Sequence, residues 1–323
     1  MDGFLCLSCG LVLVCFTVKK SAAQTETKEQ DSPMRRHEGH PARFDEGCEP
    51  SLHTGDVGQS GTLAWHHIAV TDDELIEMVV AACQRLPNAE AVNLGGSRAR
   101  GDFRQDSDWD FAVYYRGEID PEPFEDLGWP GRVFRPFEWG QVMYGGAVFD
   151  LDERHFDIHF RNLDVVDHWT REAKEGRFDV YILGFHLAGI PTYMLPGELA
   201  GSWSLWGELP RPGYPDALRN SAPPFWLGRA NRELDYARYW TTSVNPISCA
   251  ETLAKVVLQG AHARLAHRGI WALNEKRMVQ WADLTNLYGR FSSLGSSGED
   301  LDLAVEEVRA AIGEIATEVL DRP

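Results

Sequence analysis

Two stretches of the sequence decide the fold: residues 95–100, GGSRAR, and residues 107–115, SDWDFAVYY. Residues 91–94, AVNL, predict a buried strand before the first stretch, and the two glycines then break that strand. The residues after Ser97 can begin a helix, with Ser97 available near its N-terminus. The first stretch therefore predicts a strand, a glycine turn and the start of a helix.

A turn of this kind suits a phosphate group. It exposes consecutive backbone N–H groups beside the positive end of a helix, and its glycines carry no Cβ atom that would obstruct a phosphate. Any tight strand-to-helix turn can also use Gly-Gly-Ser for structural reasons alone. The turn by itself is therefore compatible with both a structural role and a triphosphate site.

The second stretch predicts a strand with paired carboxylates. Alternation along a strand places Asp108 and Asp110 on one face and Trp109, Phe111 and Val113 on the other. Like charges at this spacing repel unless a cation or a positive partner lies between them. A solvated edge strand is the alternative, but it explains the pair poorly when the opposite face is so apolar. The pattern therefore favours a metal site.

A third carboxylate is expected on a neighbouring strand. Residues 147–151 and 155–160 predict a hairpin, and in its second strand Asp157 and His159 share the polar face. We expect Asp157 rather than Asp150 to join the site, because Asp157 stands in mid-strand between buried residues. A lone histidine beside an aspartate is more often a structural partner, so His159 is not expected among the catalytic residues.

In this order, Gly96-Ser97, the paired Asp108 and Asp110, and the distant Asp157 resemble the signature of the polymerase-β-like nucleotidyltransferase superfamily. The resemblance covers about residues 91–160. The Ser-Asp-x-Asp form is similar to that of the bacterial small-molecule branch, which includes aminoglycoside-modifying enzymes. The resemblance implies an α+β fold, in which an N-terminal mixed-sheet nucleotidyltransferase domain is followed by an all-helical C-terminal domain.

The resemblance also implies the metals and the catalytic residues. Asp108 and Asp110 would hold two Mg²⁺ ions, and Asp157 would complete the shell of the catalytic metal and draw a proton from the acceptor hydroxyl. Attack on the α-phosphorus of a nucleoside triphosphate, with ATP as the expected donor, would then release pyrophosphate. The expected catalytic and metal-binding set is therefore Asp108, Asp110 and Asp157.

The donor phosphates are expected at the glycine turn. By the same resemblance, Gly96 and Ser97 would hold the β- and γ-phosphates through backbone and hydroxyl donors. Arg98 and Arg100 begin the following helix, where an arginine is often only solvated. Arg98 is included in the expected nucleotide-binding set and Arg100 is not.

Residues 1–69 differ from the rest of the chain. An apolar run at residues 4–18 resembles a secretion signal, but no basic residue precedes it and it is shorter than the about 20 residues that span a bilayer. Residues 24–67 are polar and follow neither the period of a strand nor that of a helix. We predict a disordered leader, either dispensable or a start-site extension, with Met34 and the neighbourhood of Val70 as alternative beginnings.

Residues 70–200 are expected to form the nucleotidyltransferase domain, which opens with a capping box at residues 71–74. Residues 201–323 are expected to be helical, after a connection interrupted by Pro210, Pro212, Pro215, Pro223 and Pro224. Their helices are predicted near residues 225–240, 247–267, 275–287 and 301–320.

The run Asn274-Glu275-Lys276-Arg277 leaves two interpretations open. Lys276 can contact phosphate and Glu275 can act as a base. Alternatively, Asn274 is a helix cap and the residues after it form a solvated first turn. Neither Glu275 nor Lys276 is included in the expected site.

Charge and cysteine content restrict the function and the compartment. The formal net charge is −18, so the attraction to phosphate that supports nucleic-acid binding is missing, and we expect neither a nucleic-acid nor a membrane partner. Residues 102–167, which hold all three expected carboxylates, carry a net charge of −10.

Four of the six cysteines lie in the leader, which leaves Cys83 and Cys249 in the remainder. No disulfide framework follows, and a cytoplasmic location is expected.

The sequence therefore predicts an Mg²⁺-dependent enzyme that transfers a nucleoside monophosphate, with AMP from ATP as the expected case. The expected acceptor is a hydroxyl of a small molecule such as an aminoglycoside-like antibiotic, which would confer antibiotic resistance. One alternative is adenylylation of a protein partner, as in antitoxin-type enzymes. Another is a non-catalytic nucleotide-binding module.

Overall fold

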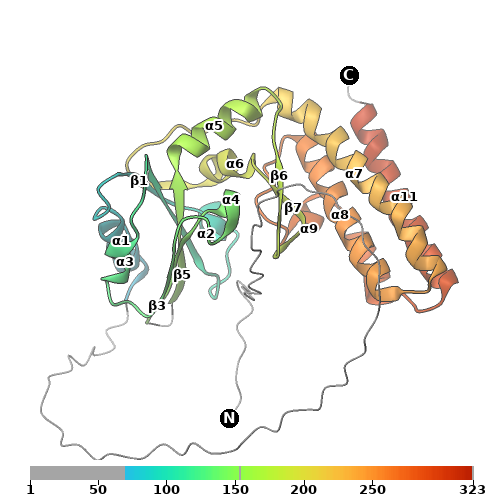
Figure 1. Ribbon diagram of the computed structural model, residues 1–323, viewed down its shortest axis with the longest axis horizontal. Helices are drawn as coiled ribbons and strands as arrows, with labels where there is room; N and C mark the ends of the chain where they lie inside the picture. Colours follow the sequence, from blue (N-terminus) through green and yellow to red (C-terminus); the bar gives the residue numbers. More distant parts are fainter. Residues whose placement is uncertain (1–69, 153, 322–323) are drawn as a thin grey trace, which may run out of the picture. The chain divides into compact units, whose positions relative to one another are not determined.

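The computed structural model describes residues 70–152 and 154–321 (Figure 1). The predicted leader at residues 1–69, with its apolar run, its four cysteines and the alternative start at Met34, lies outside the described residues. Within the described residues, no helix is long and apolar enough to cross a membrane.

Eight strands are present in the described residues. They are β1 (Ala89–Leu94), β2 (Trp109–Tyr115), β3 (Gly131–Phe134), β4 (Gly146–Leu151), β5 (Arg154–Asn162), β6 (Val180–Leu183), β7 (His186–Pro191) and β8 (Trp203–Trp206). The helices of the same residues are α1 (Asp72–Cys83), α2 (Gly96–Arg100), α3 (Glu122–Glu125), α4 (Gly140–Met143), α5 (Leu163–Lys174), α6 (Met194–Gly201), α7 (Asp216–Thr242), α8 (Pro246–Arg268), α9 (Met278–Trp281), α10 (Tyr288–Ser292) and α11 (Gly298–Leu320), with a 3₁₀ turn at Thr285–Leu287.

Six strands form one mixed sheet in the order β3-β4-β5-β2-β1-β8. β2 and β5 run parallel, and every other neighbouring pair in this sheet is antiparallel. Strands β6 and β7 form a separate hairpin. The predicted α+β class, with a mixed sheet followed by a helical region, is confirmed.

Each face of the sheet has its own apolar core. On one face, residues of α1 and α3 pack against the alternating apolar side chains of β2 and β5, including Phe111 and Ile158. On the other face, residues of α5 and α6 cover Ala91 of β1 and Tyr114 of β2. The capping box predicted at residues 71–74 is present, since Thr71 and Glu74 each accept a hydrogen bond from the other's backbone N–H.

The helical region is built on three long helices, α7, α8 and α11, which lie side by side (Figure 1). α7 begins at Asp216 and runs through Pro223 and Pro224, so the prediction that these two prolines belong to a connection is wrong. A proline in a helix interior removes a hydrogen bond. Here Pro223 is buried, and packing of α7 against α8 compensates for the lost bond.

The single helix predicted over residues 275–287 is also wrong. The structure has only the short α9 and a 3₁₀ turn there. Asp283 lies between them with a φ of 54°, in the left-handed region, which a continuous right-handed helix does not allow. Its carboxylate accepts a hydrogen bond from Arg268 at 2.6 Å, which stabilises this break.

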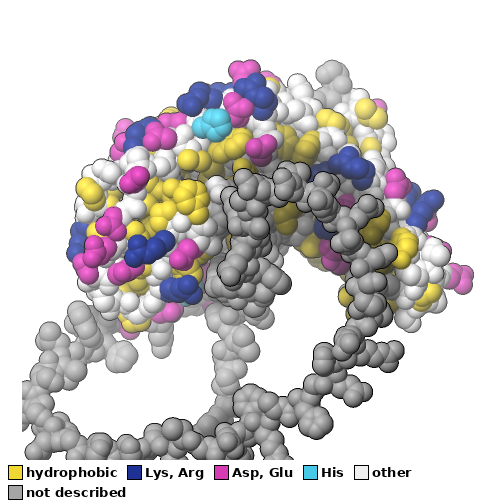
Figure 2. Space-filling model, in the orientation of Figure 1, with side chains coloured by type: hydrophobic (Ala, Val, Ile, Leu, Met, Phe, Trp, Pro, Cys, Tyr) yellow, Lys and Arg dark blue, Asp and Glu magenta, His cyan; other side chains and the backbone are white. Residues whose placement is uncertain are grey.

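The described residues lie in one compact unit. Strand β8, which follows the predicted boundary at residue 200, pairs with β1 at the edge of the sheet. The division into residues 70–200 and 201–323 stays a prediction. On the face shown in Figure 2, acidic and basic side chains are interspersed, so that face carries no large patch of one sign.

A buried ion pair joins the sheet to α6. The guanidinium of Arg161 on β5 donates to both carboxylate oxygens of Glu198, at 2.6 and 2.9 Å, and to the carbonyl of Met143 at 2.8 Å. Only 1% of the Arg161 side chain is exposed. Removing one partner of such a pair leaves an uncompensated charge in the interior.

We therefore expect Arg161→Ala to lower the free energy of unfolding by about 3–5 kcal/mol, as for other broken buried pairs. Arg116→Ala is the matched control, because Arg116 contacts Asp164 and Asp167 on the surface. This substitution should lower the free energy of unfolding by about 1 kcal/mol or less. Denaturant-induced unfolding measures both values. Equal losses in the two variants would contradict this account.

Candidate active site

The glycine turn lies directly against one carboxylate. The backbone N–H of Gly95 donates to the Asp110 carbonyl at 2.7 Å, and α2 begins at the next residue. Gly96 has a φ of 63°, and a Cβ atom there would collide with the Asp110 carboxylate. The glycine is therefore required both for the backbone conformation and for the close approach.

Two carboxylates meet on the parallel strands. In the register of β2 and β5, Asp110 stands directly opposite Asp157. Asp157 is only 7% exposed, and its Oδ1 atom is buried without a hydrogen-bond partner. Asp150, the alternative that the sequence offered, lies at the end of β4, where its carboxylate contacts His155 at 2.9 Å.

Burial and mutual repulsion make these carboxylates hard to ionise. Burial, together with the charge of Asp108, raises the pKa of Asp110 to about 6. Burial, together with the charges of Asp110 and Asp108, raises the pKa of Asp157 to about 7. A divalent cation would supply the missing positive charge, and the unpartnered Asp157 oxygen is a suitable ligand for it.

His159 belongs to the same cluster. One potential ligand atom from each of Asp110, Asp157 and His159 lies within 4.8 Å of the others, which is close enough for one metal ion. Burial, together with the charge of Arg161, lowers the pKa of His159 to about 4, so the imidazole is neutral. Its Nδ1 atom is buried without a hydrogen-bond partner. Its position two residues after Asp157, on the same face, was the sequence signal for this role.

Asp108 immediately precedes β2 and is partly exposed. Its charge acts on both Asp110 and Asp157, as their raised pKa values show. The structure therefore places all three predicted carboxylates within electrostatic reach of one another, with Asp157 buried and Asp108 and Asp110 partly exposed.

Arg98 braces the loop that leads to Asp108. Its Nε and Nη2 atoms donate to the Ser107 carbonyl at 3.2 and 2.8 Å. Its guanidinium lies 4.0 Å from the centre of the Trp109 ring. These contacts give Arg98 a structural role beside its predicted role in phosphate binding. Ser97 is partly exposed at the start of α2, as a phosphate-binding hydroxyl requires.

The run of residues 274–277 also reaches this site. The charge of Lys276 lowers the pKa values of Asp110 and Asp157, and Lys276 is exposed. Glu275 accepts hydrogen bonds from the backbone N–H groups of Leu187 and Ala188, both at 2.8 Å, so its carboxylate is committed to a structural role. Of the two residues that the sequence left open, Glu275 is therefore a structural anchor to the β7 backbone.

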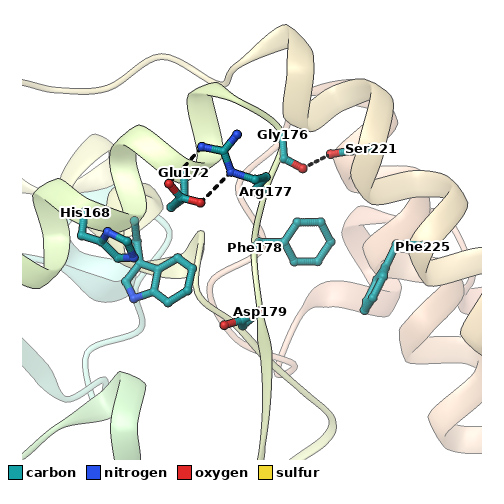
Figure 3. Close-up of a pocket in the computed structure, with 9 residues that line it drawn as sticks. His168, Glu172, Gly176, Arg177, Phe178, Asp179, Ser221 and Phe225 are labelled. Atoms are coloured by element: carbon teal, nitrogen blue, oxygen red, sulfur yellow. Dashed lines mark hydrogen bonds and ion pairs between the residues drawn. The ribbon is translucent and has the colours of Figure 1, made fainter.

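A cavity lies between α5 and α7 (Figure 3). Arg177 donates to Glu172 at 2.7 Å, and the Ser221 hydroxyl donates to the Gly176 carbonyl at 2.6 Å. The ring of Phe178 meets that of a neighbouring phenylalanine edge to face. None of the predicted site residues lines this cavity.

One comparison with known protein families agrees with this geometry. Residues 77–128 match the family described as "Polymerase beta, Nucleotidyltransferase". The chain contains a polymerase-β-type nucleotidyltransferase domain. The match covers the glycine turn, Asp108 and Asp110, whereas Asp157 and His159 lie beyond it. This domain identifies the protein as a nucleotidyltransferase.

The chain is also similar to a solved structure of a nucleotidyltransferase-like protein from Exiguobacterium sibiricum 255-15. The sequence identity is 11%, the alignment covers 78% of this chain and 82% of the other, and the TM-score is 0.39. No curated protein matches the chain.

The contact between Gly96 and Asp110 can be tested with two glycine variants. We expect Gly96→Ala to displace the Asp110 carboxylate and to weaken Mn²⁺ binding at least about tenfold, because a ligand is lost from the site. Gly101→Ala is the control, since Gly101 also has a positive φ (76°) but has open space around it. Titration calorimetry measures the affinity of each variant. If both bind equally weakly, backbone strain alone is responsible.

The raised pKa values predict a pH dependence of stability in the absence of divalent metal. Between about pH 4 and pH 7 the folded nucleotidyltransferase holds protons on Asp110 and Asp157 that the unfolded chain has lost, so stability falls as pH rises through this range. Asp157→Asn removes one of these groups. We expect thermal unfolding between pH 5 and pH 8 to show a smaller decline for this variant than for the wild type, and an unchanged decline would refute the assignment.

Proposed function

We propose that this nucleotidyltransferase is Mg²⁺-dependent and moves a nucleoside monophosphate, with ATP as donor, to a hydroxyl of a small molecule. The observation that carries the proposal is the pair Asp110 and Asp157, which stand opposite each other on parallel strands beside the glycine turn. Paired carboxylates at a phosphate-binding turn are what metal-assisted transfer of a phosphoryl-type group requires.

Asp108, Asp110 and Asp157 are the residues that would hold the magnesium ions, and His159 lies close enough to contribute. When bound, the ions supply positive charge at the α-phosphate and at the leaving oxygens. The oxygen ligands present are the type that magnesium prefers, whereas the imidazole would also suit manganese or zinc.

The chain's own residues account for the remaining steps. The acceptor oxygen forms a bond to the α-phosphorus while the bond to pyrophosphate breaks, and the hydroxyl proton moves to a base. Asp157 is suited to be that base, because it stands opposite Asp110 and its buried Oδ1 atom has no hydrogen-bond partner. The N–H groups of the Gly96–Ser97 turn are suited to hold the β- and γ-phosphates.

The acceptor we propose is an aminoglycoside-like compound, which makes the protein an antibiotic-resistance enzyme. The net charge of −10 over residues 102–167 supports this choice, since such compounds are polycations that carry hydroxyl groups. The same charge disfavours a nucleic-acid substrate.

The test is to incubate the full chain with Mg²⁺, each labelled triphosphate in turn and a panel of amino-sugar acceptors. Pyrophosphate release should depend on an acceptor. Asp108→Asn, Asp110→Asn and Asp157→Asn should each lower the rate by about 100-fold or more, as the loss of a charge-stabilising group does elsewhere. Asp126→Asn is the control, because Asp126 is exposed at the end of α3, and its rate should equal that of the wild type.

The other outcomes each identify a different function. Label that appears only on protein would replace the small-molecule acceptor with a protein acceptor. Triphosphate binding without turnover under every condition would show a non-catalytic nucleotide-binding module.

A further inference from the structure

A histidine completes the group of ligand atoms at the paired carboxylates. One ring nitrogen of His159 lies within 4.8 Å of a carboxylate oxygen of Asp110 and of one of Asp157. In the register of the sheet, His159 stands opposite Ala112 on β2 and Gly146 on β4. Neither of these cross-strand neighbours has a polar side-chain atom, so neither can satisfy the imidazole.

A tryptophan packs against this imidazole. The ring of Trp139 meets the ring of His159 edge to face, with 5.6 Å between the ring centres. Gly146 makes room for this contact, because a Cβ atom there would collide with the Trp139 ring. The Nδ1 atom of His159 is buried and has no hydrogen-bond partner within the residues that the structure describes. Because buried polar atoms are normally bonded, a packed imidazole of this kind keeps bonding capacity for a ligand.

The other histidine beside Asp157 is placed differently. His155 lies two positions before Asp157 on β5, as His159 lies two positions after it. The Nδ1 atom of His155 is 2.9 Å from the Asp150 carboxylate, and its Nε2 atom is 3.9 Å from Asp157 Oδ1. Among the described residues, the group around Asp110 and Asp157 includes His159 and not His155. The same strand therefore provides both a ligand and a matched control for it.

A nitrogen ligand changes which ions a site prefers. Mg²⁺ favours oxygen ligands and keeps several waters. Imidazole suits Zn²⁺ and other late first-row ions, and these ions bind a given nitrogen and oxygen site more tightly than Mn²⁺ does. Two carboxylates and one imidazole are therefore better matched to Zn²⁺ than to Mg²⁺.

We propose that His159 is a direct metal ligand, so that Asp110, Asp157 and His159 form a mixed nitrogen and oxygen site at which Zn²⁺ displaces Mg²⁺. The inference rests on the proposed function, because it takes the paired carboxylates as a metal site. It goes beyond that function in assigning a metal-selecting residue and a competing ion. Zn²⁺ then regulates the transfer by occupying the position of Mg²⁺.

The first test is pulsed EPR of Mn²⁺ bound to the full chain, because this paramagnetic ion reports the nitrogen nuclei among its ligands. Wild type and His155→Gln should both show coupling to nitrogen, and His159→Gln should lose it. Labelling histidine alone with the heavy nitrogen isotope should change the coupling in the wild type, which identifies the nitrogen without any substitution. Asp157→Asn should lose tight Mn²⁺ binding, which assigns the signal to this group.

The second test is competition for the bound Mn²⁺. Its release by Mg²⁺, or by Zn²⁺ at a buffered free concentration, gives the affinity of each competing ion, and buffering prevents thiols elsewhere in the chain from depleting Zn²⁺. His159→Gln should weaken Zn²⁺ binding about 10- to 100-fold. The same variant should weaken Mg²⁺ binding by no more than about twofold. His155→Gln should change neither affinity, and thermal unfolding shows whether each variant is folded.

Four results would overturn the inference. Mn²⁺ bound to the wild type without nitrogen coupling would refute the role of His159 and leave the proposed function intact. Coupling that persists in His159→Gln and disappears in His155→Gln would do the same. Equal losses of Zn²⁺ and Mg²⁺ affinity in His159→Gln would refute the selectivity. A wild type that binds no divalent ion would refute the proposed function, and this inference with it.

Discussion

The parallel pairing of β2 with β5 is the constraint on which the site depends. It sets Asp110 opposite Asp157 in the middle of a mixed sheet, with apolar cores on both faces. Two carboxylates in that position repel each other and lose hydration, and their raised pKa values express this cost. A fold gains nothing from such an arrangement unless a cation binds between the carboxylates. The unfavourable electrostatics of the unliganded site and its capacity for metal therefore have the same cause.

The surrounding structure holds that unfavourable pair in place. The glycine turn packs directly against Asp110, and Arg98 braces the loop before β2 through Ser107 and Trp109. Arg161, which lies further along β5, carries a buried positive charge, and the carboxylate of Glu198 neutralises it. Burial, together with the positive charge of Arg161, lowers the pKa of His159 and keeps it neutral, which is the form that can bind metal.

Local patterns were sufficient to predict strands β1, β2, β4 and β5. The alternation around Asp110 and Asp157 is a strand signal with a period of two, and it identifies polar positions on an otherwise apolar strand. The sequence predicted only that Asp157 lies on a neighbouring strand, and the parallel register that sets it opposite Asp110 is seen in the structure alone. The helix over residues 275–287 was wrongly predicted because the backbone is left-handed at Asp283, whose carboxylate accepts a hydrogen bond from Arg268. Helix propensity contains no information about such a contact.

The contacts of Glu275 and Arg277 could not be predicted for a related reason. An Asn-Glu-Lys-Arg run has the composition of a capped, solvated helix start, and nothing within it distinguishes that case from a functional one. The distinction lies in partners that are far away in sequence, since Glu275 binds the β7 backbone and Arg277 binds Asp102. Charged residues on either side of Lys276 are thus used as anchors between segments that are far apart in sequence.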